Sequence, residues 1–137
     1  MFQRIVLAVD GSDRDALAVS AAASLADKAG GSITVLHVVE NKPDGAPRHE
    51  ADGTLRGDRV VDDAVRALAE VGIEAIARST PTQSGSIGVA VVDVAHEEEA
   101  DTIVIGSRGL TDSKALLLGS VAHDVVHFFR GCIVVAR

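Results

Sequence analysis

A set of spaced glycines, Gly106, Gly109 and Gly119, is the feature of this chain best suited to chemistry. The first two follow an apolar run, and Gly119-Ser120 follows Gly109 after nine intervening residues and opens a helix-like run. Glycine lets the backbone approach a ligand closely and adopts positive φ without a Cβ clash. A helix that begins at Gly119-Ser120 directs several unpaired N–H groups at one place, which is a phosphate-binding arrangement. The spacing therefore predicts a nucleotide ligand.

Polar side chains within this motif suit a phosphate group. Arg108 lies between two glycines, where its guanidinium can neutralise phosphate charge, and Ser120 can donate to a phosphate oxygen. The alternatives are a solvated arginine and a serine that only caps the last helix. Lys114 lies in the same loop, and we expect it to be solvated rather than bound to a terminal phosphate.

Asp10 follows the first apolar run of the chain, 5–9, as Gly106 follows a later one. In doubly wound sheets the ligand lies outside the carboxyl ends of the strands, where the strand order reverses. If these two strands are neighbours, Asp10 and Gly106 face one crevice. Asp10 can then receive a ribose hydroxyl or help to hold a phosphate-bound metal ion, because a bare carboxylate repels phosphates. The alternative is that Asp10 has only a structural role, in which it shapes an Asp-Gly-Ser turn and helps to cap the first helix. Ser12, in the same turn, is the expected N-cap residue of that helix.

Other candidate sites are weaker. His123 and His127 have the i, i+4 spacing of metal ligands, but no third ligand is evident, and we predict no metal site. The chain has no GxxxxGK[ST] motif, no Gly-x-Ser-x-Gly motif and a single cysteine, Cys132, which we expect to be buried. No convincing nucleophile and base pair is found, so we predict binding rather than catalysis and no catalytic residue.

Five apolar runs, at 5–9, 32–39, 73–78, 102–105 and 133–135, are predicted as strands. The third is the most polar and suits a sheet edge. Amphipathic segments at 13–28, 58–71, 85–99 and 119–129 are predicted as helices, with Val61, Ala64, Val65, Leu68 and Val71 on one side of the second. Residues 40–57 are rich in proline and glycine and are predicted as a surface loop. The alternation predicts a single α/β domain over 1–137, a doubly wound parallel sheet with helices on both faces.

The composition limits the class of partner. The net charge is -7, from 20 acidic and 13 basic residues, which argues against nucleic acid or an anionic membrane as the partner. The apolar runs are shorter than a membrane span requires. One cysteine and no evident targeting segment predict a cytoplasmic protein.

Four segments of the chain share a recognisable pattern: residues 5–12 (IVLAVDGS), residues 101–106 (DTIVIG), the spacing Gly106-x2-Gly109-x9-Gly119-Ser120, and residues 132–135 (CIVV). Together they resemble the universal stress protein family over essentially the whole chain, and in particular its ATP-binding subgroup, whose signature is this glycine spacing. The family often has Cys-Pro-Val where this chain has Cys132-Ile133-Val134.

The resemblance implies a Rossmann-like sheet of order 3-2-1-4-5, which makes the first and fourth strands neighbours. It implies an ATP site, with Mg2+, at the end of the first strand, with the backbone of Val38 or His37 meeting adenine. The implied contacts are Ala8, Val9 and Asp10 from the first strand, Ile105, Gly106, Arg108 and Gly109 at the start of the phosphate loop, and Gly119, Ser120 and Val121 at its end. It also implies a homodimer through the fifth strand, at Ile133, Val134 and Val135.

Three functions remain open at this point. The favoured one is a regulatory, stress-response protein that binds ATP as a dimer. The alternatives are a slow ATPase or phosphotransferase, and an interaction module of the same fold that holds no nucleotide. The sequence does not rank ATP against AMP or a cyclic nucleotide, because it does not show how many phosphates the loop spans.

Overall fold

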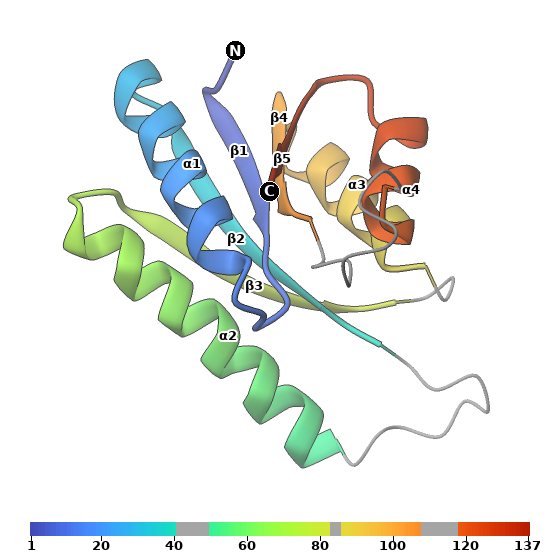
Figure 1. Ribbon diagram of the computed structural model, residues 1–137. Helices are drawn as coiled ribbons and strands as arrows, with labels where there is room; N and C mark the ends of the chain where they lie inside the picture. The colour runs from blue at the N-terminus through green and yellow to red at the C-terminus, as the bar shows by residue number, and fades with distance from the viewer. Residues whose placement is uncertain (41–49, 83–85, 108–117) are drawn as a thin grey trace.

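The computed structural model describes residues 1–40, 50–82, 86–107 and 118–137, without the side chains of 50–56. Five parallel strands form one sheet in the order β3-β2-β1-β4-β5 (Figure 1). They are β1 (Arg4–Ala8), β2 (Ser32–Val39), β3 (Ala75–Pro81), β4 (Thr102–Gly106) and β5 (Cys132–Ala136). This confirms the doubly wound sheet, the edge position of the third strand and the pairing of the first strand with the fourth.

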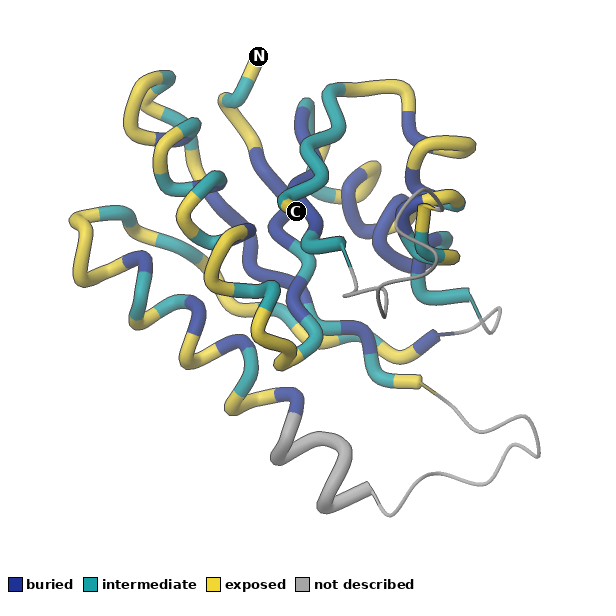
Figure 2. Tube along the Cα trace, in the orientation of Figure 1, coloured by how far each residue is buried: buried dark blue, intermediate teal, exposed yellow. Residues whose placement is uncertain are grey.

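Four helices in the described residues cover the sheet: α1 (Asp15–Ala29), α2 (Glu50–Glu70), α3 (Ile87–Glu97) and α4 (Ser120–Phe128). Helices α1 and α2 lie on one face and α3 and α4 on the other (Figure 1). Because side chains alternate along a strand, β1 sends Ile5 and Leu7 toward α1 and Val6 toward α3. The core is aliphatic on both faces, and Figure 2 shows the central strands as its most buried part. No described helix has the length and apolarity that a membrane span would need.

Helix α2 is longer than the sequence predicts, because residues 50–57 are helical and do not belong to a loop. Gly57, which argued for a loop, is buried inside the helix against the ring of His37. A Cβ on Gly57 would lie 2.8 Å from His37 Cδ2, so the close approach of the helix requires glycine there. The helix ends at Glu70, one residue before the predicted end at Val71, and Val71 is 65% exposed. The remainder of the predicted loop, 41–49, lies outside the described residues.

Smaller differences have local causes. Helix α1 begins at Asp15 with Arg14 as the N-cap, so the prediction that Ser12 caps it was wrong. Cys132 is half-buried rather than buried, because β5 is an edge strand with one neighbour in the described sheet. Gly30 ends α1 in the left-handed conformation, φ 65°, as a C-terminal glycine should.

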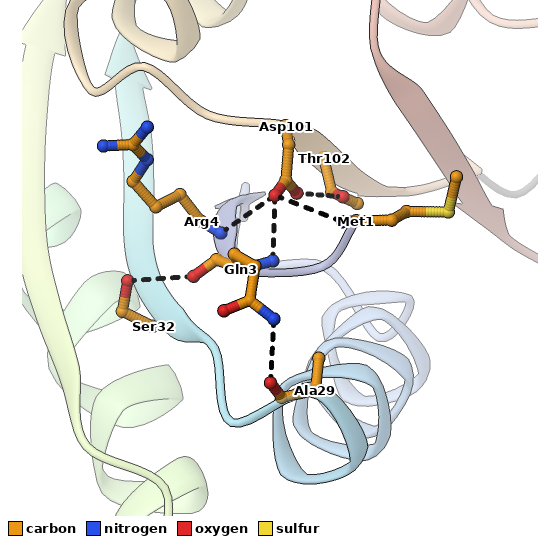
Figure 3. Close-up of polar contacts among 7 residues, drawn as sticks. All are labelled: Met1, Gln3, Arg4, Ala29, Ser32, Asp101 and Thr102. Carbon is orange, nitrogen blue, oxygen red and sulfur yellow. Dashed lines mark hydrogen bonds and ion pairs between the residues drawn. The ribbon is translucent and has the colours of Figure 1, made fainter.

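At the amino end of the sheet, Asp101 joins three strands (Figure 3). Its carboxylate accepts hydrogen bonds from the backbone N–H of Gln3 at 2.9 Å and from the Thr102 hydroxyl at 2.7 Å. Its backbone carbonyl accepts from the N–H of Cys132 at 2.9 Å, and its N–H donates to Arg4 at 3.0 Å. The residue before β4 therefore fixes the register of β1, β4 and β5.

Candidate functional site

A cavity of about 220 Å³ opens at the carboxyl ends of β1, β2 and β4. The chain leaves β1 toward β2 on one side and reaches β4 on the other, so the cavity lies at the point where strand order reverses. The residues that line it are Ala8, Val9, Asp10, Ser12, Asp15, Leu36, His37, Val38, Val39, Glu40, Ile87, Val91, Ile105, Gly106 and Val121. We call this cavity the crevice.

The crevice brings together seven of the predicted site residues: Ala8, Val9, Asp10, Val38, Ile105, Gly106 and Val121. Gly119 and Ser120 do not line it and lie at the start of α4. Arg108 and Gly109 lie outside the described residues, as does Lys114. The sequence analysis missed Ile87 and Val91, whose only signal was their place at the start of an apolar helix.

Helix α4 is held close to α3, and this places Val121 at the crevice. A Cβ on Gly88 would lie 2.8 Å from the carbonyl oxygen of Val121, so glycine permits the contact between the helices. The hydroxyl of Ser86 caps α3 by accepting the N–H of Val89, and it donates to Asp124 Oδ2 at 2.6 Å. This hydrogen bond, followed by that from the His123 ring, lowers the pKa of the Asp124 carboxyl.

Among the described residues, no side chain caps the start of α4. Its N-cap is Gly119, which has no side chain to accept a hydrogen bond. Ser120 is the first residue of the helix, so it does not have the capping role that was the alternative to phosphate binding. A Cβ on Gly119 would meet no described atom within 4 Å, so packing among the described residues does not require glycine there. Uncapped N–H groups at a helix N-terminus attract anions.

Steric crowding explains why position 106, at the end of β4, is a glycine. A Cβ at this position would lie 3.1 Å from Arg14 Cβ and 3.3 Å from its carbonyl oxygen. Glycine therefore lets the turn before α1 approach the end of β4. The two strand ends that the sequence analysis paired, at Asp10 and Gly106, consequently meet across one crevice.

The turn between β1 and α1 is built around two carboxylates. Asp10 Oδ1 accepts the N–H of Ser12 at 2.9 Å, which is the turn-forming bond considered as an alternative role for Asp10. Asp15 accepts the N–H of Asp10 at 3.2 Å and that of Gly11 at 2.7 Å. Gly11 has a φ of 82°, a conformation that glycine adopts without strain. The sequence analysis missed that Asp15 organises this turn.

The two carboxylates affect one another. Burial raises the pKa of the Asp15 carboxyl, the nearby charge of Asp10 adds to this, and the two backbone N–H groups only partly oppose it. Glu40 is the third charged residue on the described lining, which includes no lysine or arginine. This side of the crevice is therefore acidic, and a polyphosphate needs either a cation beside it or a position closer to α4.

His37 forms part of the wall between β2 and α2. Its Nδ1 lies 3.0 Å from the carbonyl oxygen of Val9, and a carbonyl accepts only, so Nδ1 carries the proton. Gly57 of α2 packs against the same ring. His37 is thus a partly exposed, packed histidine that ties the end of β1 to β2.

His123 and His127 lie outside the crevice on α4. Their rings are stacked, with centroids 6.2 Å apart and planes at 3°. Across the described ranges, no group of three or more His, Cys, Asp or Glu side chains is arranged to hold a metal ion. The pair therefore lacks a third protein ligand among those residues.

The fold and the crevice define a doubly wound α/β protein with a binding cavity at its switch point. The universal stress protein family matches residues 1–134, and the chain belongs to this family. It is 34% identical to a universal stress protein of Thermus aquaticus, with 92% of each chain covered, and 29% identical to the universal stress protein YxiE of Bacillus subtilis over the whole of both.

Solved structures share the fold. A universal stress protein from Archaeoglobus fulgidus is 25% identical, with a TM-score of 0.82 and all of both chains covered. A second structure from Archaeoglobus fulgidus, in complex with dAMP, is 24% identical with a TM-score of 0.78 and 98% of each chain covered. A universal stress protein in complex with cAMP is 22% identical with a TM-score of 0.78, covering 98% of this chain and 97% of its own.

Proposed function

We propose that the crevice binds an adenine nucleotide, and that the ligand is ATP accompanied by Mg2+. The observation that carries this proposal is the cavity at the switch point, which gathers seven of the residues that the family resemblance implies for nucleotide contact. Two structural relatives that share the fold are complexes with dAMP and with cAMP, which supports an adenine ligand.

Each part of the crevice suits a different part of the nucleotide. The base fits the apolar region beside Val38, Ile105 and Val91, where a flat ring is removed from water. Asp10 either receives a ribose hydroxyl or helps to hold a metal ion bound to the phosphates. The phosphates extend toward Gly106 and the start of α4, with Arg108, Gly109, Gly119, Ser120 and Val121 completing the contacts.

The donor set fits Mg2+ in the presence of phosphates. Carboxylate oxygens and phosphate oxygens are the ligands this ion prefers, and Asp10 is the predicted protein ligand on the acidic side of the crevice. When bound, the ion would neutralise charge between this carboxylate and the polyphosphate. Burial, and to a smaller extent the charge of Asp10, raises the pKa of the Asp15 carboxyl, so a second ionised carboxylate beside Asp10 is unfavourable without a cation.

We propose a regulatory role rather than turnover. The sequence offers no convincing nucleophile and base pair, which favours binding over catalysis. Nucleotide contact with the segment between Gly106 and Ser120 would alter a surface that a protein partner reads. Slow ATP hydrolysis or phosphotransfer is the alternative, and it predicts that labelled ATP is converted at a rate that Asp10→Ala abolishes.

We further propose that the chain forms a homodimer through β5 in the cytoplasm. Ile133, Val134 and Val135 are all partly exposed, and β5 has one strand neighbour in the described sheet. An apolar edge strand of this kind promotes association unless it is paired, and antiparallel pairing with a second copy covers it. The single cysteine is compatible with a reducing compartment.

The test is calorimetric titration of nucleotide-free protein with Mg-ATP. We expect saturable binding that Gly109→Val abolishes and Asp10→Ala weakens about tenfold or more. Asp13→Ala is the matched control, because Asp13 is exposed in the same turn and does not line the crevice. Titrations with dAMP and cAMP rank the ligands. If nucleotide-free protein binds none of the three, the crevice does not bind adenine nucleotides.

A further inference from the structure

A groove of about 750 Å³ lies between α1 and α2, on the face of the sheet away from α3 and α4 (Figure 1). We call it the α1–α2 groove. It is separate from the crevice except at Ser12 and Asp15, which line both. The proposed nucleotide site does not account for it.

The groove has the length of a short helix. Its lining runs from Asp15 to Asp27 along α1 and from Arg59 to Ala67 along α2, with Val71 just beyond the end of α2. At the helical rise of about 1.5 Å per residue, the α1 wall is about 18 Å long, or between three and four turns. The two helices run in the same direction (Figure 1), and Val60 packs against Gly11 at the end nearest the crevice.

The walls are made of small side chains, which leaves room for larger ones from outside. Ala16, Ser20, Ala23 and Ser24 face the groove from α1, and Ala67 faces it from α2. Ala16, Ser20 and Ser24 are exposed, so the groove is open to solvent along its length. An incoming helix could therefore place Leu, Phe or Met side chains between α1 and α2.

The charges on the described lining of the groove are mainly acidic. Among the described residues, Asp15, Asp27 and Asp63 line it, against one arginine, Arg59. Asp15 and Asp63 lie toward the crevice end and Asp27 toward the other, so both ends carry a carboxylate. Asp63 pairs with Arg66 at 3.7 Å, but both side chains are more than 70% exposed, so this ion pair is weak and easily replaced.

We propose that the α1–α2 groove docks a basic amphipathic helix of a protein partner. The partner helix would insert apolar residues at i, i+3 or i+4, and i+7, and its flanking lysines or arginines would face the three aspartates. Charge complementarity selects this occupant over a neutral ligand or an acidic helix. The match between the groove and a helix of about three turns selects a helix over a loop.

The experiment uses the full chain and two labelled synthetic peptides of 18 residues, about five turns. One has leucines on one helical face and lysines on its flanks, and the other has glutamate in place of each lysine. Fluorescence anisotropy is expected to show saturable binding of one Leu/Lys peptide per chain, weakened by added salt. Equal binding of the Leu/Glu peptide, or no saturable binding of the Leu/Lys peptide, would overturn the proposal.

Two matched pairs of variants locate the binding. Ser20→Trp fills the groove and is expected to weaken binding about tenfold or more, whereas Leu17→Trp, on α1 but not on the lining, should change it less than about twofold. Asp63→Lys should weaken binding more than Asp62→Lys, the neighbouring residue outside the lining.

All four positions are exposed, so the variants should fold as the parent does, which circular dichroism checks. Equal losses within both pairs would show that the peptide binds elsewhere, and the proposal would fail. The crevice is tested separately by nucleotide titration, so neither result of the peptide experiment bears on the nucleotide proposal.

Discussion

The two ends of the sheet are built differently. At the amino end, Asp101 accepts from Gln3, Arg4 and Thr102, and Gln3 Nε2 donates to the carbonyl of Ala29 at 2.8 Å (Figure 3). At the carboxyl end, the described side chains of β1, β2 and β4 surround a cavity of about 220 Å³. The backbone groups at the amino end are therefore paired in hydrogen bonds with neighbouring residues, whereas the carboxyl end contains a cavity.

The carboxylates at the two ends show the same contrast. Burial opposes ionisation of Asp101, but hydrogen bonds from Thr102 and from the backbone of Gln3 and Arg4 outweigh it, and the pKa of Asp101 is lowered. Asp15 has two such backbone bonds, yet burial and the neighbouring Asp10 outweigh them and its pKa is raised. The amino end is therefore organised for stability, while the carboxyl end tolerates an unfavourable charge where we propose that a ligand binds.

The largest expected effect is at Gly31 on the amino end. A Cβ there would lie 2.0 Å from the carbonyl oxygen of Phe2, and backbone cannot give way as a flexible side chain can. We expect Gly31→Ala to lower the free energy of unfolding by about 3 kcal/mol. Urea denaturation measures the change.

Gly30→Ala is the matched control for this steric effect. A Cβ on Gly30 meets no described atom within 4 Å, and its cost comes only from its φ of 65°. We expect about 1 kcal/mol for this variant. Equal losses for Gly30→Ala and Gly31→Ala would show that the backbone contact with Phe2 does not constrain the amino end.

The second effect is the removal of the Asp101 carboxylate. Asp101→Ala deletes the acceptor for the buried Thr102 hydroxyl and for the N–H of Gln3. The Asp101 side chain is 34% exposed, so water replaces part of what is lost, and we expect a destabilisation of about 2 kcal/mol. Asp93→Ala, at an exposed position on α3, should change stability by less than about 0.5 kcal/mol. Similar values for the two variants would contradict a special role for Asp101.

Asp101 also predicts a pH dependence. Its pKa is lower in the folded chain than in the unfolded chain, so its contribution is complete above the unfolded pKa and is lost as pH falls through the folded pKa. The difference in unfolding free energy between the parent and Asp101→Ala should therefore shrink below about pH 4. Denaturant titrations between neutral and acid pH measure it, and a difference that stays constant would show that ionisation of Asp101 does not matter.

The sequence predicts structure that has a local pattern and misses structure that depends on contacts between distant residues. Continuous apolar runs such as β2 (Ser32–Val39) were predicted at their observed bounds, because burial on both faces leaves a strong local pattern. The extension of α2 through Gly57 depends on its contact with His37, a residue distant in sequence, and no local signal reveals it.

The candidate site divides in the same way. Asp10 and Gly106 could be placed together, because parallel strands end at one edge of the sheet. The part played by Asp15 could not, since a carboxylate in the first helical turn has the same sequence signal whether it faces solvent or accepts backbone N–H groups. Ile87 and Val91 line the crevice through the packing of α3, which depends on how the helix is rotated against the sheet.

The smallest expected effect is at Asp15, on the carboxyl end. Its pKa is raised on folding, so its favourable contribution is complete below the unfolded pKa and is lost as pH rises through the folded pKa. Asp15→Asn removes the titration but also places an amide N–H2 against a backbone N–H, a cost that does not depend on pH. The slope with pH is therefore the informative quantity. From about pH 3 to pH 7 the parent should lose stability relative to Asp15→Asn, by less than the changes expected at Gly31 and Asp101. For Asp13→Asn, at an exposed position in the same turn, the free energy of unfolding should change with pH as it does in the parent. A relative gain by the parent would mean that the backbone N–H groups of Asp10 and Gly11 outweigh burial, and the two ends of the sheet would then treat their carboxylates alike.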